Sequence, residues 1–521
     1  MLNFKPSIST LAIGAVLSTS LVLGGCNKKP DVSKSEEIVL KDRTVSETDA
    51  VRALKLMGLD VSGSNEFVWA ARSGSAGNYT YTDIVRKDED DGVTGAGSLE
   101  LRGVHMEGDQ PAFDQLVLKN FQSKDDDALI SFKTITLTEP TAALAGAIGL
   151  VMGGDEDAFD DMEGDVAFSA ISFSGLKVSG DDGVLTLDGV KLAKTADGKG
   201  IFTFDNLDMD MTDNGKSIKM KLGAINVVGV NIDKYKDMVA AMVEEGKAGE
   251  GFDEKSLKAL VGSMNPYDPD FENFSLTNFN MNAQGLIINL DSLTGTAKKK
   301  GGKTIMSQTM SPLTITPPKE TTDKDMIKFN EAMATLGYDA LEFTMEQNSV
   351  LDEAADSMIV KDSYIAMKDG FNLSFDYDML GYKAYLEAAI ASTANANMNP
   401  MDAMAMMEAF KIKSMRIALR DDSIVERAFK LAAKQQGGTP AALKNQAKMG
   451  LAFLPMMAQD EGQQKIASEL STALGAWLEN SGTLVFDMKP ETPVSIGEIG
   501  KNSMNGDFDA ASLGLTITHE E

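Results

Sequence analysis

The 521-residue chain contains little of the material from which common catalytic and metal sites are built. One cysteine excludes a disulfide within the chain, and two histidines leave few ligands for a histidine-based site. Lys and Arg total 49 against 78 Asp and Glu, which gives a formal net charge of -29. Because nucleic-acid binding needs an excess of cationic side chains, no nucleic-acid partner is expected.

Recognisable catalytic motifs are also missing. The chain has no Gly-x-Ser-x-Gly, no His-Glu-x-x-His and no Gly-x-Gly-x-x-Gly between a strand and a helix. His105 falls in a strand-like run and is predicted to be structural, whereas His519 lies near the C-terminus, where order is not expected. A carboxylate pair could still cleave glycosides, but two tryptophans provide few of the aromatic platforms that sugars use. We therefore expect no enzymatic activity and no cofactor.

What the chain does have is a distinctive N-terminus. Lys5 supplies positive charge, and the apolar stretch that follows is too short to span a bilayer as a helix. It ends in Leu23-Gly24-Gly25-Cys26, which resembles the lipobox of bacterial lipoproteins. The resemblance implies that residues 1–25 are a signal peptide and that Cys26 carries the lipid that anchors the chain to a membrane. An ordinary signal peptide with an incidental cysteine is the alternative.

The residues after the cysteine indicate where the anchor resides. Residues 26–45 are polar and are predicted to form a flexible tether. In enterobacterial lipoproteins an aspartate after the cysteine favours the inner membrane, and Asn27 takes that position here. The resemblance therefore implies a body anchored to the outer membrane and facing the periplasm, with the cell surface as the alternative.

Most of residues 66–316 alternates apolar and polar side chains with a period of two, as in Leu185-Thr186-Leu187-Asp188. This pattern is typical of antiparallel strands with one buried and one solvated face. Gly, Asn and Asp clusters separate the runs, which favours a meander. The predicted fold class is α+β: an extended antiparallel β-sheet, as a meander or groove, with packed helices and a C-terminal half richer in helix.

One hairpin can be registered residue by residue. Asn214-Gly215 favours a two-residue turn, because both turn residues need positive φ. In the register that this turn sets, apolar residues face apolar residues and acidic residues face basic ones. The predicted pairs are Asp213–Lys216, Met211–Ile218, Asp210–Lys219, Met209–Met220, Asp208–Lys221 and Leu207–Leu222.

Two domains are predicted after the tether. The first covers 46–316, is rich in strands and carries a helical insert over 234–243 and 256–263. The second covers 319–521 and is α+β, with a helical segment over 384–480. Pro317-Pro318 is the predicted boundary between them.

Four helix starts carry capping signals. Ser46 and Thr322 are predicted to cap helices that end near Gly58 and Gly337. Asp422 is predicted to cap a third helix, and Thr439, followed by a proline, begins a fourth.

Two apolar segments are candidates for a ligand site. Residues 142–152 carry no charge, and a buried helix, a lid over an apolar cavity and a membrane-dipping segment are the three interpretations. The Met-rich segment 398–407 is predicted to pack a core, with an adaptable apolar site or a Cu(I) site as alternatives. The candidate site residues are Leu144, Ile148, Leu150, Met152, Met404 and Met407.

Charged clusters give weaker signals. Residues 298–304 end like a phosphate-binding loop, but Ala297 stands where the first glycine is required, so we predict a basic hairpin tip. It is either a solvated turn or a contact for anionic lipid. The acidic clusters at 88–91, 125–127 and 155–161 are predicted to be solvated turns, with loose calcium binding as the alternative. No metal site is predicted.

The texture of residues 66–316, short strands joined by Gly/Asp turns, loosely resembles AsmA-type and other β-groove proteins of the bacterial envelope. The stretch from Asp422 to Val494 is similar to the tail of uncharacterised proteobacterial envelope proteins. A long antiparallel sheet with one apolar face and packed helices could form a groove for acyl chains. We therefore expect a non-enzymatic, membrane-anchored protein that binds or transfers an apolar or lipid ligand, or assists envelope assembly. A scaffolding lipoprotein that contacts other envelope proteins without a small ligand is one alternative, and a Met-rich copper-binding protein is another.

Overall fold

We describe the protein from a computed structural model. The structure describes residues 43–63, 67–87, 93–125, 128–155, 158, 167–181, 183–195, 198–213, 216–230, 267–269, 271–384, 408–458, 461–499 and 511–521. These residues fall into an N-terminal unit, 43–230 with 275–283, and a C-terminal unit, 267–274 with 284–521. The predictions that lie outside the described residues are the signal peptide with Cys26, the tether up to residue 42, the helical insert, the acidic cluster at 88–91, most of those at 125–127 and 155–161, and the Met-rich segment 398–407 with Met404 and Met407.

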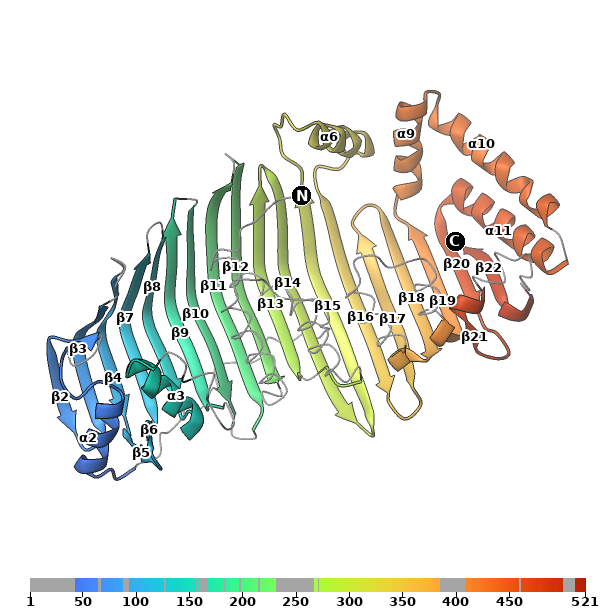
Figure 1. Ribbon diagram of the computed structural model, residues 1–521. Helices are drawn as coiled ribbons and strands as arrows, with labels where there is room; N and C mark the ends of the chain where they lie inside the picture. The colour runs from blue at the N-terminus through green and yellow to red at the C-terminus, as the bar shows by residue number, and fades with distance from the viewer. Residues whose placement is uncertain are drawn as a thin grey trace. The chain divides into compact units, whose positions relative to one another are not determined.

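The N-terminal unit consists of antiparallel strands, with two helices near its first strands (Figure 1). Its elements are α2 (Glu47–Leu56), α3 (Ala142–Met152), β1 (Phe67–Val68), β2 (Ala71–Ser75), β3 (Asn78–Lys87), β4 (Val93–Arg102), β5 (His105–Glu107), β6 (Gln110–Ala112), β7 (Gln115–Asp125), β8 (Ala128–Thr138), β9 (Ala170–Gly180), β10 (Gly183–Lys194), β11 (Gly200–Asp213), β12 (Lys216–Val230) and, from residue 275 on, β13 (Asn273–Ala283). β1 and β2 both pair with β3, and the order continues through β4, β7, β8, β9, β10, β11 and β12. β5 and β6 form a separate hairpin.

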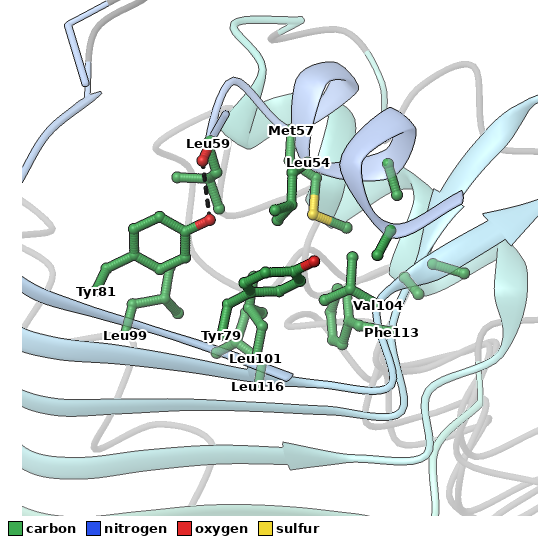
Figure 2. Close-up of a cluster of buried hydrophobic side chains, with 14 of the residues drawn as sticks. Leu54, Met57, Leu59, Tyr79, Tyr81, Leu99, Leu101, Val104, Phe113 and Leu116 are labelled. Carbon is green, nitrogen blue, oxygen red and sulfur yellow. Dashed lines mark hydrogen bonds between the residues drawn. The ribbon is translucent and has the colours of Figure 1, made fainter. Parts of the chain in front are cut away.

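The core of this unit lies where α2 packs over β3 and β4 (Figure 2). Leu54 and Met57 of α2 and the following Leu59 are fully buried there. They contact the side chains that β3 and β4 direct to the same face, among them Tyr81 and Leu99. The Tyr81 hydroxyl donates a hydrogen bond to the Leu59 carbonyl oxygen at 2.8 Å, so its one polar atom is satisfied inside the core.

The C-terminal unit is also antiparallel and carries most of the helix. Its elements are β14 (Leu286–Lys300), β15 (Lys303–Thr316), α6 (Lys324–Leu336), β16 (Leu341–Asp352), β17 (Ser357–Met367), β18 (Phe371–Leu380), β19 (Lys411–Asp421), α9 (Ile424–Gln436), α10 (Pro440–Ala452), η2 (Leu454–Met457), α11 (Glu461–Asn480), β20 (Gly482–Met488), β21 (Val494–Ser495), η3 (Ala511–Leu513) and β22 (Leu515–Glu520). The strand order runs β14 to β20 by number and ends on β22, while β21 adds to β19. The predicted fold class, an α+β protein built on antiparallel sheet, is confirmed.

The registered hairpin is confirmed as β11 and β12. All six predicted pairs occur, from Asp213–Lys216 to Leu207–Leu222. Its two cross-strand ion pairs, Lys219–Asp210 and Lys221–Asp208, each have a distance of 2.7 Å. The basic segment is a hairpin tip too, since β14 ends at Lys300 and β15 begins at Lys303, its partner in the register.

The helical segment predicted over 384–480 needs a correction. Residues 411–421 form β19, which pairs with both β18 and β20. Ile412 is buried, whereas Lys411 and Lys413 on either side of it are exposed, an alternation that a strand satisfies and a helix does not. The predicted boundary at Pro317-Pro318 lies inside the C-terminal unit, which begins before it.

Two predicted caps are confirmed and one moves by a residue. Ser46 Oγ accepts from the Asp49 backbone N–H at 3.1 Å, and Thr439 Oγ1 accepts from that of Ala442 at 3.2 Å. At α6 the cap is Asp323, not Thr322. The Asp323 carboxylate accepts from two backbone N–H groups, at 2.9 and 3.1 Å, and its charge is favoured at a helix N-terminus.

The start of α9 also differs from the prediction. The Asp421 carboxylate accepts from the backbone N–H groups of Ser423 and Val425, both at 3.1 Å. Asp422, the predicted cap, instead makes an ion pair with Arg420 at 3.0 Å. The N-cap position itself is Ser423, and the side chain that accepts from the first turn of the helix belongs to Asp421, one position before the predicted cap.

Asp421→Ala should lower the free energy of unfolding of the C-terminal unit by about 1 kcal/mol, the usual cost of losing a helix cap. Asp422→Ala should cost less than about 0.5 kcal/mol, because it removes only an exposed ion pair. Urea unfolding followed by Trp477 fluorescence in a Trp69→Phe background measures both. Equal losses in the two variants would contradict the assignment of Asp421 as the cap.

Candidate functional site

In the described part of the N-terminal unit, five strands contain an internal residue whose φ lies close to the ideal left-handed value. These residues have φ between 50° and 60°, and they are Asp83, Asn120, Gly175, Asn206 and Asn278. They lie in β3, β7, β9, β11 and β13. These are alternate strands, because one strand without a residue of this set lies between each successive pair. Asn, Asp and Gly adopt this conformation at the lowest cost, which explains why only these residue types occur here.

The strand registers place these residues in one row across the sheet. Gly97 stands opposite Asp83 on one side and opposite Asn120 on the other, as the flanking pairs require. The Asn206 side-chain amide donates to the carboxylate of its neighbour, Asp188, at 2.9 Å. We call this row the left-handed row.

Small neighbours make room for the side chains of the row. A Cβ added to Gly223 of β12 would lie 2.9 Å from the Cβ and Nδ2 atoms of Asn278. Where the left-handed residue is itself a glycine, the relation is reversed, and Lys133 lies across Gly175. The residues of the row therefore match their positions in two ways: their types tolerate positive φ, and the size of each side chain suits the residue opposite it.

Each left-handed residue shifts the inward and outward alternation of its strand by one. In β11, Phe204 is buried before the row, and Leu207 and Met209 are buried after it. Between them Asn206 is exposed, as is Asp208 beyond it. An uninterrupted strand would have turned Leu207 outward, so the row keeps the apolar face continuous along the full strand.

Part of that apolar face is incompletely covered. We define the aromatic strip as six half-buried residues of β7, β8, β9 and β10: Leu118, Phe121, Phe132, Ile135, Phe173 and Val190. The Phe132 ring centroid lies 6.0 Å from that of Phe121 and 5.8 Å from that of Phe173.

The strip is continuous with the core beneath α2. Leu118 and Phe121 pack against the fully buried core cluster. On the other side Ile135 is paired with Phe173, and Phe173 with Val190. One apolar surface is thus fully buried beneath α2 at its start and only partly buried farther along.

The predicted site residues on α3 lie near the core beneath α2. Leu144, Ile148 and Met152 are half-buried and pack against the core cluster, and Leu150 is half-buried. The helix approaches its neighbours through small residues, since a Cβ on Gly149 would lie 2.9 Å from the Pro111 ring. These contacts fit the buried-helix interpretation of residues 142–152, and a role for the four residues in ligand binding stays a prediction.

The two histidines lie outside the strip. His105 is buried, with Nδ1 2.6 Å from the Gly103 carbonyl oxygen. His519, expected to be unordered, lies in β22 opposite Leu484, because the chain end is held by pairing with β20. Within the ranges that the structure describes, no group of three or more His, Cys, Asp or Glu side chains could hold a metal ion. No helix in those ranges is long and apolar enough to cross a membrane.

Neither the left-handed row nor the aromatic strip was predicted from the sequence. The signal was an interruption of the period-two pattern at an Asn, Asp or Gly between apolar residues. It is clearest in Phe-Asp-Asn-Leu-Asp-Met at 204–209 and Leu-Thr-Asn-Phe-Asn-Met at 276–281. Aligning these interruptions would have predicted the row, and with it the set of side chains that share the apolar face.

Comparison with known proteins adds little about this face. A family model described as "Uncharacterized protein" matches residues 364–520, from within β17 to β22. No curated protein matches the chain. The matched residues cover less than half of the chain and exclude the aromatic strip.

Proposed function

We propose that this protein is a non-enzymatic, membrane-anchored lipoprotein of the bacterial envelope that binds or transfers an apolar or lipid ligand on the aromatic strip. The observation that carries the proposal is the continuity of the strip: incompletely buried aromatic and aliphatic side chains on four adjacent strands. Single exposed apolar residues are ordinary on a protein surface, whereas a contiguous group indicates a binding surface.

The dimensions and chemistry of the strip suit an extended hydrocarbon chain. Three inter-strand spacings of about 4.8 Å separate β7 from β10, so the strip extends for about 14 Å across the sheet. None of its six residues is charged or carries a nucleophile. A ligand on the strip would therefore be held by apolar contact without reaction, which favours binding or transfer over catalysis.

The N-terminus supports the proposed location. The lipobox-like Leu23-Gly24-Gly25-Cys26 would place a lipid anchor ahead of the tether. The described body begins at Arg43, so a short polar segment would separate it from the membrane. We place the anchor in the outer membrane, with the body in the periplasm.

Fatty-acid uptake tests the proposal. We would use the chain from residue 26 onward with Cys26→Ser, since all described contacts lie beyond it. Phe132→Ser should weaken binding of a fluorescent fatty acid about tenfold, because the central ring of the strip is lost. Ser131→Ala, next to Phe132 on the same strand and therefore with its side chain on the other face, should change binding less than about twofold.

The outcomes separate the proposal from its alternatives. Equal affinities for both variants would exclude the strip as the binding surface. A protein that takes up no fatty acid and is purified from envelopes without bound lipid would favour the scaffolding lipoprotein. Its envelope partners could then be found by crosslinking.

A further inference from the structure

The turn between α10 and α11 exposes an unusual group of apolar side chains. We define the apolar tip as Met449, Phe453, Met456 and Met457, at the end of α10 and in η2. They are exposed by 60%, 59%, 78% and 76%. No other large apolar side chain in the described parts of the chain is as exposed as the three methionines.

The apolar tip is connected to helices of the C-terminal unit that pack against one another. α10 packs against α9 and α11, and η2 packs against α11 (Figure 1). Lys448, directly before the tip, makes an ion pair with Glu479 of α11. Thr439 caps the other end of α10. The exposure of the tip therefore belongs to a fixed helical hairpin, whose inner residues Leu451 and Leu454 are half-buried.

The chemistry of the tip favours a lipid surface over a protein partner. Residues 449–458 contain no charged side chain and no side-chain hydrogen-bond donor. Protein interfaces carry about one hydrogen bond per 100–200 Å², whereas a bilayer interior requires none. Unbranched methionine side chains also adapt readily to an irregular or fluid surface.

Of the two lysines that flank the tip, Lys448 is paired with Glu479, so the side chain that can extend toward lipid phosphates is that of Lys444; Asp460 and Glu461 follow the tip in the sequence. Lys444 and Lys448 are half-buried on the last turns of α10 before the tip. Lysines just behind an inserted apolar segment extend their ammonium groups to the phosphate level while their methylenes stay with the apolar residues.

We propose that the apolar tip inserts shallowly into a lipid bilayer and gives the protein a second membrane contact besides its proposed lipid anchor. An insertion of this depth needs only a few large apolar side chains at the acyl boundary. The inference does not depend on ligand binding by the aromatic strip.

Vesicle sedimentation of the chain from residue 26 with Cys26→Ser tests the proposal. Vesicles of phosphatidylcholine mixed with phosphatidylglycerol should bring down the protein. Phe453→Ser combined with Met456→Gln should lower the partition coefficient by roughly tenfold per side chain. The matched control, Val184→Thr with Ile305→Thr, changes two apolar side chains that are 39% and 41% exposed elsewhere and should leave it unchanged.

A unique label locates the contact. Cys26 is the only cysteine, so Met457→Cys in the Cys26→Ser chain offers one thiol for a polarity-sensitive dye. Its emission should shift to the blue with vesicles, whereas a dye at Val61→Cys, a site 59% exposed in the N-terminal unit, should not respond. No shift at position 457, or a shift that appears on concentrating the protein without vesicles, would overturn the proposal. The second result would indicate contact between copies.

The two proposals can fail separately. The tip variant should still take up fatty acid without vesicles, and Phe132→Ser should still bind vesicles. If both variants lose both activities, neither surface has the role assigned to it.

Discussion

Leu99→Ala is expected to lower the free energy of unfolding of the N-terminal unit by about 2–5 kcal/mol. Leu99 is 1% exposed, and its strand neighbours in the register are Tyr81 and Leu118. Removing its outer carbons leaves a cavity under α2 (Figure 2). The neighbouring strands β3 and β7 cannot close this cavity, because sheet pairing with β4 holds them in place. The same change also removes a packing partner of Leu118, the first residue of the aromatic strip.

The measurement can be confined to this unit. Of the two tryptophans, Trp69 lies in the N-terminal unit, with its ring 5.1 Å from that of Tyr81. Urea unfolding followed by fluorescence in a Trp477→Phe background therefore reports on the core around Leu99. Leu129→Ala is the matched control, because Leu129 is 36% exposed, and it should cost less than about 1 kcal/mol. Similar losses in the two variants would show that α2 does not cover a packed core.

Asn206→Val should destabilise the N-terminal unit by about 1–3 kcal/mol. A β-branched residue is strained in the left-handed conformation that this position requires, and the hydrogen bond to Asp188 is lost as well. Asn206→Gly should cost less than about 0.5 kcal/mol, since glycine adopts positive φ freely. The Trp69 unfolding assay measures both changes.

The pair of substitutions separates conformation from contact. Both remove the Asn206 side-chain amide, so an equal cost would assign the effect to the hydrogen bond with Asp188. A cost confined to valine would assign it to the backbone of the left-handed row.

Local rules were sufficient for the parts of the fold where one turn or cap decides the geometry. The β11–β12 register followed from the preference of Asn-Gly for positive φ and from the match of charges across the strands. Ser46 and Thr439 were identifiable as caps because their side chains reach backbone N–H groups within the same turn. Neither inference requires knowledge of distant residues.

Competing local signals accounted for the errors. Asp421 and Asp422 are both able to cap α9, and the choice depends on Arg420, which binds Asp422. β19 was missed because helical patterns lie on both sides of it, and its strand character depends on partners in β18 and β20. Sequence spacing alone does not contain that information.

The aromatic strip and the apolar tip could not be predicted from the sequence for a related reason. The residues of the aromatic strip are ordinary core residues by sequence, and only the pairing of β7 to β10 shows that they share one face of the sheet. The tip is similar, because Met449 and Phe453 have the helical spacing of a buried face. Their exposure becomes evident only once the packing of α10 and α11 is known.

The left-handed row also has a consequence for how such a sheet can change in length during evolution. Because the residues of the row recur on every second strand, the repeating module is a hairpin, and a single strand is not. Gain or loss of a whole hairpin would preserve both the row and the side to which apolar residues point. Gain of one strand would separate two strands of the row by two others, and loss of one would place two strands that each contain a left-handed residue next to each other. Relatives of this unit should therefore differ by even numbers of strands, and the length of the apolar surface should change in steps of two inter-strand spacings, about 10 Å.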